Sequence, residues 1–442
     1  MCANQWSCFV VLVVAAIAFG QPARAADDLA GEIESILDAV LEIGLGGPPG
    51  TEHANHFRPD NVASSGRIIT ALKNFIGANT ATFPLSSTST GVTFEFSGGV
   101  PVATSASAGP IFADRARTIG RNRLSIGANY SYLGLSKIRG VKTADARFYF
   151  LHEDVGAPGM GDSPFEFDYI DLMIGMDVDA SVFVVQGSYG LLDNLDVGVS
   201  IPFVRVSLYA APLAQITSFT YNHSGMAYHY FGGTSEAPVL TLRPEPVDAT
   251  ASGVGDIALR AKYNFHRGSQ TDLSIQSEVR LPTGREEDFL GSGATSIRTL
   301  LIASKELGNL APHANIGFDY RGSDYDNNEI EVAVGYDQKI SETITLALDW
   351  LGEYEVGDAI DELQFPKPTA VGPTVDEEQL IVQVVPSTNI PNFHHDNVVN
   401  SSIGIKYTPR DNVILMANLL VPLNDGGLRS DVIPTLGLEM YF

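Results

Sequence analysis

From about residue 122 to the end of the chain, apolar and polar positions alternate with a period of two in segments of roughly ten residues. In residues 257–265 (IALRAKYNF), Ile257 and Leu259 fall on one side of an extended strand, and Arg260 and Lys262 fall on the other. Such a strand has one apolar and one polar face. Roughly ten residues is also the length that a tilted strand needs to cross a bilayer.

Twelve such segments follow one another along the chain. They cover residues 122–135, 179–191, 195–209, 254–266, 271–282, 294–306, 312–321, 328–338, 342–354, 397–408, 412–423 and 430–442. The pattern predicts an all-β fold, a transmembrane antiparallel β-barrel of about twelve strands, with periplasmic turns and termini. The long connections 210–253 and 356–396 would then be extracellular loops. Residues 164–178 also alternate; because strand numbers are even, we interpret them as an extracellular hairpin unless another strand is missing, which would make fourteen.

A soluble β-sandwich would also alternate, and aromatic residues near the strand ends favour the barrel instead. Tyr263, Phe318 and Trp350 are examples, and such residues form girdles at the two membrane interfaces. The last strand carries an alternating set that ends on an aromatic residue, which is typical of outer-membrane barrels and serves as their assembly signal. This set is Leu436, Leu438, Met440 and Phe442.

The first residues have the features of a leader. Residues 9–20 (FVVLVVAAIAFG) are apolar but too short to span a bilayer, and Ala23-Arg24-Ala25 is a small-x-small cleavage pattern. We predict a signal peptide over residues 1–25, with an uncleaved anchor as the alternative. No other stretch of 18 apolar residues occurs, which excludes helical membrane spans and favours the outer membrane of a Gram-negative bacterium.

Residues 26–121 lack the pattern of a barrel wall. Residues 27–46 place apolar side chains at helical spacing with acidic residues between them, and a second short helix is expected over 67–76. A barrel of intermediate size has a lumen narrow enough for such a segment to block. We therefore predict a partly helical periplasmic plug or lid before the barrel of residues 122–442, with a loosely ordered periplasmic extension as the alternative.

The composition of the chain limits the kinds of site and partner that it can have. Cys2 and Cys8 both lie in the predicted leader, so the mature chain has no thiol for a disulfide, a metal site or a nucleophile. Removal of Arg24 changes the formal net charge from −25 to −26, and this acidity argues against nucleic acid as a partner. No strand pairs His with Ser or Asp on one face, so we expect no enzyme activity, no cofactor and no metal ion.

The polar face of the predicted strands carries both signs of charge and would line the pore. The residues are Arg260, Lys262, Glu278, Arg280, Asp319, Arg321, Glu331, Asp337, Asp349, Glu353 and Lys406. They could form a structural network of ion pairs or a selectivity ring. A hydrophobic substrate would then need a pocket made by loops and the N-terminal segment, or a lateral exit through the wall. Pro202, which cannot donate to the ladder, marks a candidate defect, with a plain β-bulge as the alternative.

Two loop motifs have simple explanations. Gly291-Ser292-Gly293 lacks the strand-loop-helix context of a phosphate site, so we predict a tight extracellular hairpin. Residues 324–329 (DYDNNE) place oxygen ligands two apart, but they lack the glycine and the late glutamate of a calcium loop. A solvated turn is the favoured interpretation there.

Three stretches carry a resemblance to a known family. They are residues 108–132 (AGPIFADRARTIGRNRLSIGANYSY), 187–206 (GSYGLLDNLDVGVSIPFVRV) and 253–296, from GVGDIALRAKYNF through VRLPTGREEDFLGSGATS. They resemble the MetA-pathway phenol-degradation family of outer-membrane proteins, which is akin to the uptake barrels for long-chain fatty acids and aromatic hydrocarbons. The resemblance implies passage of small hydrophobic or aromatic compounds across the outer membrane. It does not extend to the acidic stretch 27–78, and it brings no motif of substrate-contacting residues.

The sequence therefore favours an outer-membrane channel for passive uptake of small hydrophobic or aromatic compounds. A surface-exposed barrel that binds a partner through its long loops, and a general porin for small polar solutes, are the alternatives. The expected partners are outer-membrane lipid and lipopolysaccharide, the barrel-assembly machinery and a small hydrophobic molecule.

Overall fold

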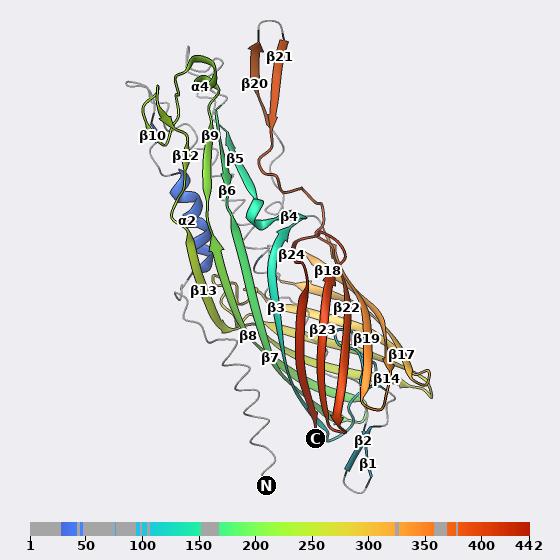
Figure 1. The fold of residues 1–442 in the computed structure, drawn as a ribbon. Helices are drawn as coiled ribbons and strands as arrows, with labels where there is room; N and C mark the ends of the chain where they lie inside the picture. Colours follow the sequence, from blue (N-terminus) through green and yellow to red (C-terminus); the bar gives the residue numbers. More distant parts are fainter. Residues whose placement is uncertain are drawn as a thin grey trace.

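The structure of the protein is a computed structural model, which describes residues 28–41, 45–46, 76, 94–97, 100–103, 107–151, 168–322, 327–357, 369–376 and 379–442. Twelve antiparallel strands form a closed ring (Figure 1). They are β3 (Leu124–Ile138), β7 (Met176–Leu192), β8 (Leu195–Ala210), β14 (Ile257–Arg267), β15 (Thr271–Leu281), β16 (Ser296–Lys305), β17 (Leu310–Arg321), β18 (Asn328–Lys339), β19 (Ile344–Val356), β22 (Val398–Arg410), β23 (Val413–Pro422) and β25 (Ile433–Tyr441).

The ring closes where the last strand pairs with the first, from Thr435 opposite Ser131 to Tyr441 opposite Ser125. Each predicted strand boundary lies within three residues of the observed one. The prediction of a twelve-stranded barrel is confirmed. Short turns and both ends of the ring lie at one end of the barrel, hereafter the turn end, and the long connections lie at the other, the loop end (Figure 1).

Period-two alternation places apolar side chains on the outside of the ring. Leu301, Ile316 and Leu436 are 53, 55 and 61% exposed, whereas the charged side chains between such positions face inward and are buried. A closed ring has no unpaired edge, and an apolar exterior suits lipid. The four predicted assembly-signal residues, Leu436, Leu438, Met440 and Phe442, alternate with the buried Thr435, Glu439 and Tyr441 along this outer surface.

One side of the wall continues above the ring as a second sheet. Its strands are β5 (Arg147–Leu151), β6 (Tyr169–Met173), β9 (Leu213–Thr217) and β12 (Thr241–Leu242), in the order β12-β9-β6-β5. We call it the upper sheet. Only two residues separate β6 from β7, and two separate β8 from β9, so the upper sheet extends these barrel strands. The described part of residues 164–178, which were predicted to form an extracellular hairpin, supplies β6 and the first residues of β7. The partners of β6 are β5 and β9, which lie outside that range.

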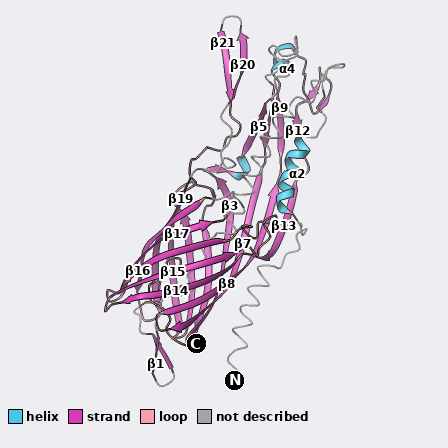
Figure 2. Ribbon diagram, turned by 180° about the vertical axis from the view of Figure 1, so that it is seen from behind, coloured by secondary structure: helices cyan, strands magenta, loops and turns pink. Residues whose placement is uncertain are grey.

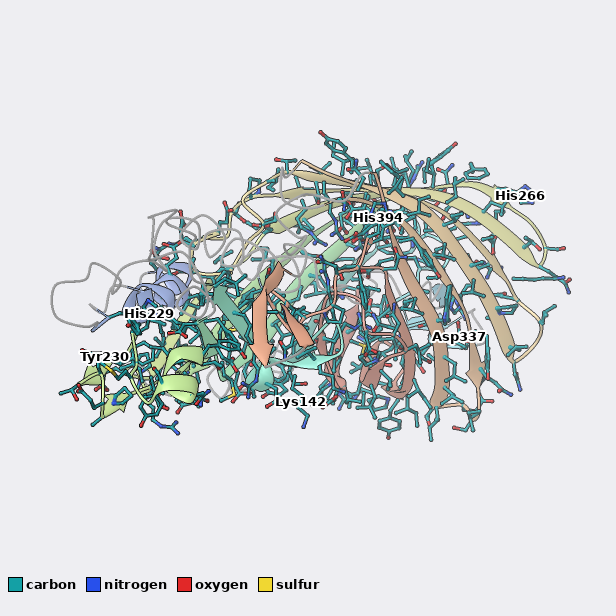
Figure 3. The ribbon with its side chains drawn as sticks, turned by 90° about the horizontal axis from the view of Figure 1, so that it is seen from above. Lys142, His229, Tyr230, His266, Asp337 and His394 are labelled. Carbon is teal, nitrogen blue, oxygen red and sulfur yellow. The ribbon has the colours of Figure 1, made fainter. Side chains whose placement is uncertain are left out.

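The remaining elements lie mostly at the loop end. They are β4 (Val141–Lys142), the 3-10 turn η2 (Thr143–Asp145), α4 (Phe219–Ser224), β10 (Gly232–Gly233), β11 (Pro238–Val239), β13 (Val247–Val254), β20 (Thr369–Asp376), β21 (Gln379–Val385) and β24 (Leu428–Ser430). β1 (Phe94–Ser97) and β2 (Val100–Ala103) pair with each other near the turn end. Seen from above, the upper elements around His229 and Tyr230 lie to one side of the barrel strands that carry Asp337 (Figure 3).

Helix α2 (Leu29–Leu41) confirms the helix predicted within residues 27–46. It buries Leu29, Ile33, Ile36 and Val40 and packs against β13 at the loop end (Figure 2). The sequence predicted a periplasmic location for this segment, and the helix lies instead at the opposite end of the barrel. The physical reason is that its apolar face finds an apolar partner there. The predicted leader, and the helix predicted over 67–76 except for Ile76, lie outside the described residues.

That partner is the inner face of β3, β7 and β8, which together we call the tall wall. Near the turn end the inward residues of β3, β7 and β8 are polar, namely Ser125, Asn129, Ser131, Gln186, Ser188, Asp196 and Ser200. Further up the same strands they become apolar, namely Leu133, Leu135, Val178, Ala180, Val182, Val184, Val204, Val206, Leu208 and Ala210. The apolar residues form one cluster with the buried face of α2 and with the upper sheet. This wall therefore has a polar lower half and an apolar upper half, whereas on β15 and β17 the buried charges Glu278, Arg280 and Asp319 lie toward the loop end.

Candidate functional site

The polar half of the barrel contains a stretch of chain without regular secondary structure, residues 107–119, which we call the lumen segment. It is anchored at its centre by Arg115, whose guanidinium pairs with Asp337 on β18 and with the hydroxyl of Ser107. Arg115 and Asp337 are 3 and 0% exposed at their side chains. Ionised groups are buried at tolerable cost only when they are paired, so this contact fixes the position of the segment.

Lumen side chains also bind the backbone of the segment. Lys406 Nζ donates to the carbonyl oxygens of Ala108, at 3.2 Å, and Pro110, at 2.5 Å. Lys262 Nζ donates to the carbonyl oxygen of Arg115 at 3.1 Å. An irregular segment leaves its backbone groups without regular partners, and such groups need hydrogen bonds when they are buried. Two lysines that were predicted to line the pore therefore hold the lumen segment.

Further contacts seal the segment toward the turn end. Arg117 Nε donates to Asp272 at 2.7 Å, and Arg117 Nη1 lies 2.9 Å from Glu306. The backbone amide of Ile119 donates to Asp196 at 2.9 Å. The segment thus touches strands from around the ring and occupies the lower lumen.

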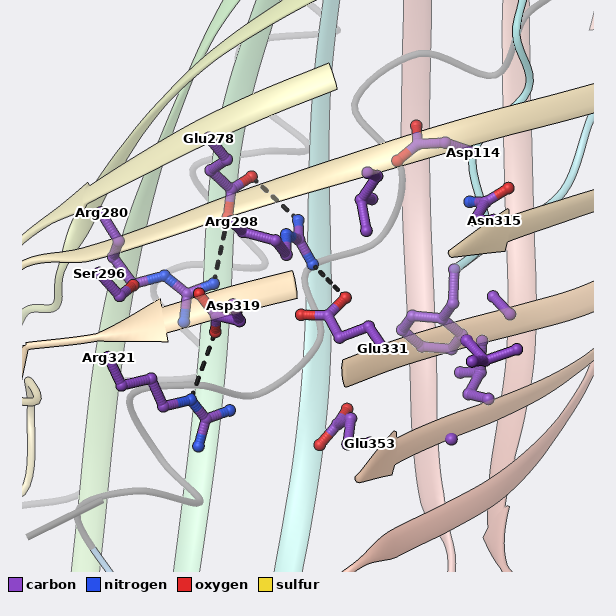
Figure 4. Close-up of a pocket in the computed structure, with 16 residues that line it drawn as sticks. Asp114, Glu278, Arg280, Ser296, Arg298, Asn315, Asp319, Arg321, Glu331 and Glu353 are labelled. Carbon is purple, nitrogen blue, oxygen red and sulfur yellow. Dashed lines mark hydrogen bonds and ion pairs between the residues drawn. The ribbon is translucent and has the colours of Figure 1, made fainter. Parts of the chain in front are cut away.

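Above the lumen segment lies a cavity with an empty volume of about 780 Å³ that opens to solvent (Figure 4). Glu278 is its electrostatic centre, because Arg260, Arg298 and Arg280 approach its carboxylate at 2.5, 3.1 and 3.3 Å. Apolar residues also line the cavity, among them Phe112 of the lumen segment. The other apolar lining residues are Leu300, Val332, Ala333 and Leu351.

A second group of charges continues the network. Arg321 contacts Asp319 at 3.3 Å and Glu329 at 2.6 Å, and Arg298 reaches Glu331 at 3.4 Å. Glu353 lies directly opposite Glu331 on the neighbouring strand, and like charges placed opposite each other in a sheet are unfavourable. Paired charges therefore line the cavity, and negative charge is in excess on the side of Glu331 and Glu353.

The structure brings most of the predicted pore-lining residues into these two groups. Glu278, Arg280, Asp319, Arg321, Glu331 and Glu353 line the cavity, with Arg260 bound to Glu278. Lys262, Asp337 and Lys406 hold the lumen segment, and the carboxylate of Asp349 accepts a hydrogen bond from Nε2 of His313 at 2.6 Å. Their role in conduction stays a prediction.

Sequence reasoning missed Arg298, Arg115 and His313. Arg298 lies on β16, where the inward positions 300 and 302 are apolar, so the charged face of that strand is not obvious from alternation. The pairing register of the strands could have identified it, because this register places Arg298 between Glu278 on β15 and Asp319 on β17. Arg115 gave no signal, because its partner is 222 residues away.

The wall has a discontinuity at the level where the interior changes from polar to apolar. β8 pairs first with β14, up to Ala258 opposite Ser200, and then with β13, from Val254 opposite Phe203. Val254 and Ala258 are four residues apart, whereas their partners Phe203 and Ser200 on β8 are only three apart. The strand opposite β8 therefore contains one extra residue, which is a β-bulge. Pro202 lies opposite it and accepts a hydrogen bond from the backbone amide of Gly255 at 2.8 Å. The predicted defect therefore lies in the strand facing Pro202, while β8 pairs with β7 without interruption there.

Above the bulge a loop replaces a strand in the wall. Among the described strands β13 pairs only with β8, because β15 ends at Leu281 and β16 begins at Ser296. Residues 282–295, which we call the wall loop, fill this place. Asp256 holds the wall loop by accepting hydrogen bonds from the backbone amides of Gly284, at 2.9 Å, and Ser292, at 2.8 Å.

The wall loop also carries two buried apolar side chains. Phe289 and Leu290 are 2 and 3% exposed and belong to the cluster that includes α2. Phe289 has a φ of 58°, an uncommon conformation for a residue with a bulky side chain. The wall loop touches α2 as well, through a 2.9 Å hydrogen bond from the backbone amide of Ala30 to the carbonyl of Glu287. The predicted tight hairpin at residues 291–293 is thus part of this closure.

Within the described part of the chain, no group of three or more His, Cys, Asp or Glu is arranged to hold a metal ion. No described helix has the length and apolar character needed to span a membrane. Of the predicted loop 324–329, residues 323–326 lie outside the described residues, and Asn328 accepts a hydrogen bond from the amide of Arg321 at 2.9 Å.

A closed antiparallel barrel with an apolar exterior is the form in which β-strands cross the bacterial outer membrane. The protein is accordingly a multi-pass barrel of the Gram-negative outer membrane.

Comparison with known proteins gives distant structural neighbours. The COG4313 outer membrane channel from Pseudomonas putida F1 is 12% identical, with 74% of this chain and 98% of that chain covered and a TM-score of 0.39. The toluene transporter TbuX from Ralstonia pickettii is 11% identical, with 73% and 90% covered and a TM-score of 0.25. No curated protein matches the sequence significantly. The model of the family described as "Putative MetA-pathway of phenol degradation" matches residues 171–425, which is more than half of the 442 residues, and the chain belongs to this family.

Proposed function

We propose that this barrel is a channel for passive uptake of small hydrophobic or aromatic compounds. The observation that carries the proposal is the change of the inner face from apolar to polar along β3, β7 and β8. An apolar solute gains free energy on leaving water for an apolar surface, by about 25 cal/mol for each Å² buried. The loop end of the barrel thus offers a favourable environment to such a solute.

The lower half offers no comparable path. The lumen segment occupies it. For an apolar molecule to pass, the ion pairs of Glu278 with Arg260 and Arg298 would have to break or lose their contact with water. Both changes are expensive, since an unpaired buried charge costs several kcal/mol. A solute that enters the apolar half would therefore leave most easily at the level where the two halves meet.

The bulge at residues 254–258 lies at that level, and the wall loop closes the barrel directly above it. Side-chain packing, hydrogen bonds to Asp256 and Thr283, and the backbone bond from Ala30 to Glu287 hold this closure. The twelve strands of the ring are held instead by backbone ladders. Movement of Phe289 and Leu290 would connect the apolar half with the lipid outside. We propose this lateral route as the exit, with the wall loop as its gate. Membership of a family described by phenol degradation supports an aromatic substrate.

The proposal can be tested by locking the wall loop. The side-chain oxygens of Asp256 and Ser292 lie 2.7 Å apart, so the variant Asp256→Cys with Ser292→Cys would allow a disulfide across the closure. The only native cysteines are Cys2 and Cys8. In cells that depend on the protein, oxidation should abolish uptake of labelled toluene or phenol, and a reductant should restore it.

Ser131→Cys with Thr435→Cys is the matched control, because these hydroxyls lie 2.8 Å apart between two paired barrel strands. Oxidation of the control should leave uptake unchanged. Equal uptake by cells with and without the protein would count against any transport of these compounds. Uptake that persists in the locked variant would count against the lateral exit alone.

The alternative functions give other results in the same assays. A general porin would pass sugars and ions in planar bilayers with no preference for aromatic compounds. A surface barrel that binds a partner would show no permeation even after deletion of residues 26–110.

A further inference from the structure

The outer face of the upper sheet has an unusual composition for a surface above a membrane. The inner face of this sheet is apolar and buried against the cluster that includes α2. The outer face carries Arg147, Tyr149, Leu151, Tyr169, Asp171, Met173, Leu213, Gln215 and Thr217, which are partly or fully exposed. Two of the four strands thus present tyrosine outward, beside the charged and polar residues Arg147, Asp171 and Gln215.

Three aromatic rings form a row on this face. The rings of Tyr149 and Tyr169 lie edge to face with centroids 6.1 Å apart. The ring of Phe219, at the start of α4, follows at 6.5 Å from Tyr169. Such rings combine a large apolar area with few rotatable bonds, so they lose little entropy when a ligand stacks on them.

A row of polar groups runs beside the rings. Asp171 lies opposite Tyr149 on one side and Gln215 on the other, and Gln215 lies opposite Thr241. Arg147 Nη1 donates to the Asp171 carboxylate at 2.6 Å. Gln215 and Thr241 are both exposed. Donors and acceptors thus lie within one side chain of the stacking platform, which matches the alternation of hydroxyl groups and C–H faces in a sugar chain.

The position of the face selects one source of sugar. Along β7 the outward residues are apolar as far as Phe183, and then Ser181, Asp179 and Asp177 form a polar band. Met173 of the upper sheet follows ten residues above Phe183, roughly 33 Å along an extended chain. The face therefore continues the lipid-facing surface upward and stands above the bilayer, in the layer that the saccharide chains of lipopolysaccharide occupy.

We propose that the outer face of the upper sheet binds the oligosaccharide of neighbouring lipopolysaccharide molecules. Sugar rings stack on Tyr149, Tyr169 and Phe219, and their hydroxyl groups bond to Asp171, Gln215 and Thr241. This contact goes beyond the transport proposal, because the face points away from the apolar interior. It tethers the tall wall to the surrounding leaflet.

The test uses the full-length protein in nanodiscs and a fluorescently labelled core oligosaccharide released from lipopolysaccharide. The variant Tyr149→Ala with Tyr169→Ala should bind this probe at least tenfold more weakly than the wild type. Tyr209→Ala removes a tyrosine that is 45% exposed on the outside of β8 but outside the row, so it should bind within twofold of the wild type. Equal binding by the double variant and the wild type would overturn the proposal.

A second measurement identifies the source. Added lipopolysaccharide with a complete oligosaccharide should compete with the probe, and lipopolysaccharide stripped of its sugars should not. Equal competition by both would show that lipid or phosphate is recognised, and this too would overturn the proposal. If the tyrosine variant does not fold, Gln215→Ala with Thr241→Ala changes only exposed residues; it should weaken binding several-fold, and unchanged binding would refute the sugar contact.

Discussion

Arg115 and Asp337 form a buried ion pair that joins the lumen segment to strand β18. The two residues are 222 apart in the sequence, and the pair closes a long loop of chain inside the barrel. Since both side chains are almost fully buried, the pair acts as an anchor with no water to replace either partner.

The first prediction concerns this anchor. Arg115→Ala leaves the Asp337 carboxylate with Ser107 and with His313, whose Nδ1 is 3.7 Å away. Removal of one partner of a buried pair costs about 3–5 kcal/mol, so the lumen segment should detach in a large fraction of molecules. Planar-bilayer recordings should show ion conductance that the wild type lacks or shows rarely.

Arg121→Ala is the control, because Arg121 is exposed near the turn end. Its conductance should equal that of the wild type. If the conductance of the Arg115→Ala variant were as low as that of the wild type, the lumen segment would not limit ion flow.

A second prediction uses the lysine that holds the segment backbone. Lys406→Met keeps the length of the side chain but leaves the carbonyls of Ala108 and Pro110 without their donor, at about 1–3 kcal/mol for each buried group. Trypsin added from the turn end should then cut after Arg115 or Arg117 more quickly. Lys305→Met alters an exposed lysine at the same end and should leave this rate unchanged.

The barrel strands could be predicted because each one carries its own evidence. The alternation of apolar and polar residues in 257–267 or 413–422 can be recognised from the sequence of each strand alone. A strand with one face toward lipid must have an apolar residue at every second position. Closure and even strand number then followed from the chemistry of an edge in lipid. The helix within residues 27–46 was likewise visible from spacing.

The interior could not be predicted in the same way. The lumen segment has no period, and its partners, such as Asp337 and Lys406, lie more than 200 residues further along the chain. The inward residues of β7 alternate equally well whether they are polar, as at Gln186, or apolar, as at Val182. Period-two analysis finds the faces but not the change along them, so the apolar upper half was missed.

A third prediction addresses the wall loop. Asp256→Ala removes the acceptor for the amides of Gly284 and Ser292. Hydrogen bonds to a charged acceptor contribute about 1.5–3 kcal/mol each, so amide exchange in residues 283–293 should accelerate at least tenfold. Hydrogen-exchange mass spectrometry would measure it, with Asp179→Ala as the control because Asp179 is exposed and accepts from Tyr132 on the outer surface. Unchanged exchange would show that side-chain packing alone closes the wall.

A fourth prediction tests the docking of α2. Ile33 is 1% exposed in the cluster with the tall wall, and Ile33→Ala should weaken docking by about 2–5 kcal/mol. Ser35→Ala on the exposed side of the helix should change it by less than about 0.5 kcal/mol. The amides of α2 report both effects by hydrogen exchange. Equal protection in the two variants would mean that this helix is held by contacts other than its apolar face.

The last prediction concerns pH and the Arg147–Asp171 contact, which lies above the membrane. Burial raises the pKa of the Asp171 carboxyl above its ordinary 3.8, and the nearby Arg147 opposes this shift without cancelling it. A raised pKa in the folded state means that the protonated carboxyl is favoured by folding. The stabilising contribution is therefore present at low pH and is lost as the pH rises through the raised value.

Asp171→Asn should consequently keep or slightly improve the stability of the upper sheet at neutral pH, although it removes an ion pair. The gain should be below about 1 kcal/mol, because Arg147 is 41% exposed at its side chain and water replaces its partner. Amide exchange in β5 and β6, corrected for the intrinsic pH dependence, should slow in the wild type as the pH falls toward 4 and should lose this trend in the variant. Faster exchange in the variant at neutral pH would reverse the sign and show that the pair itself stabilises the sheet.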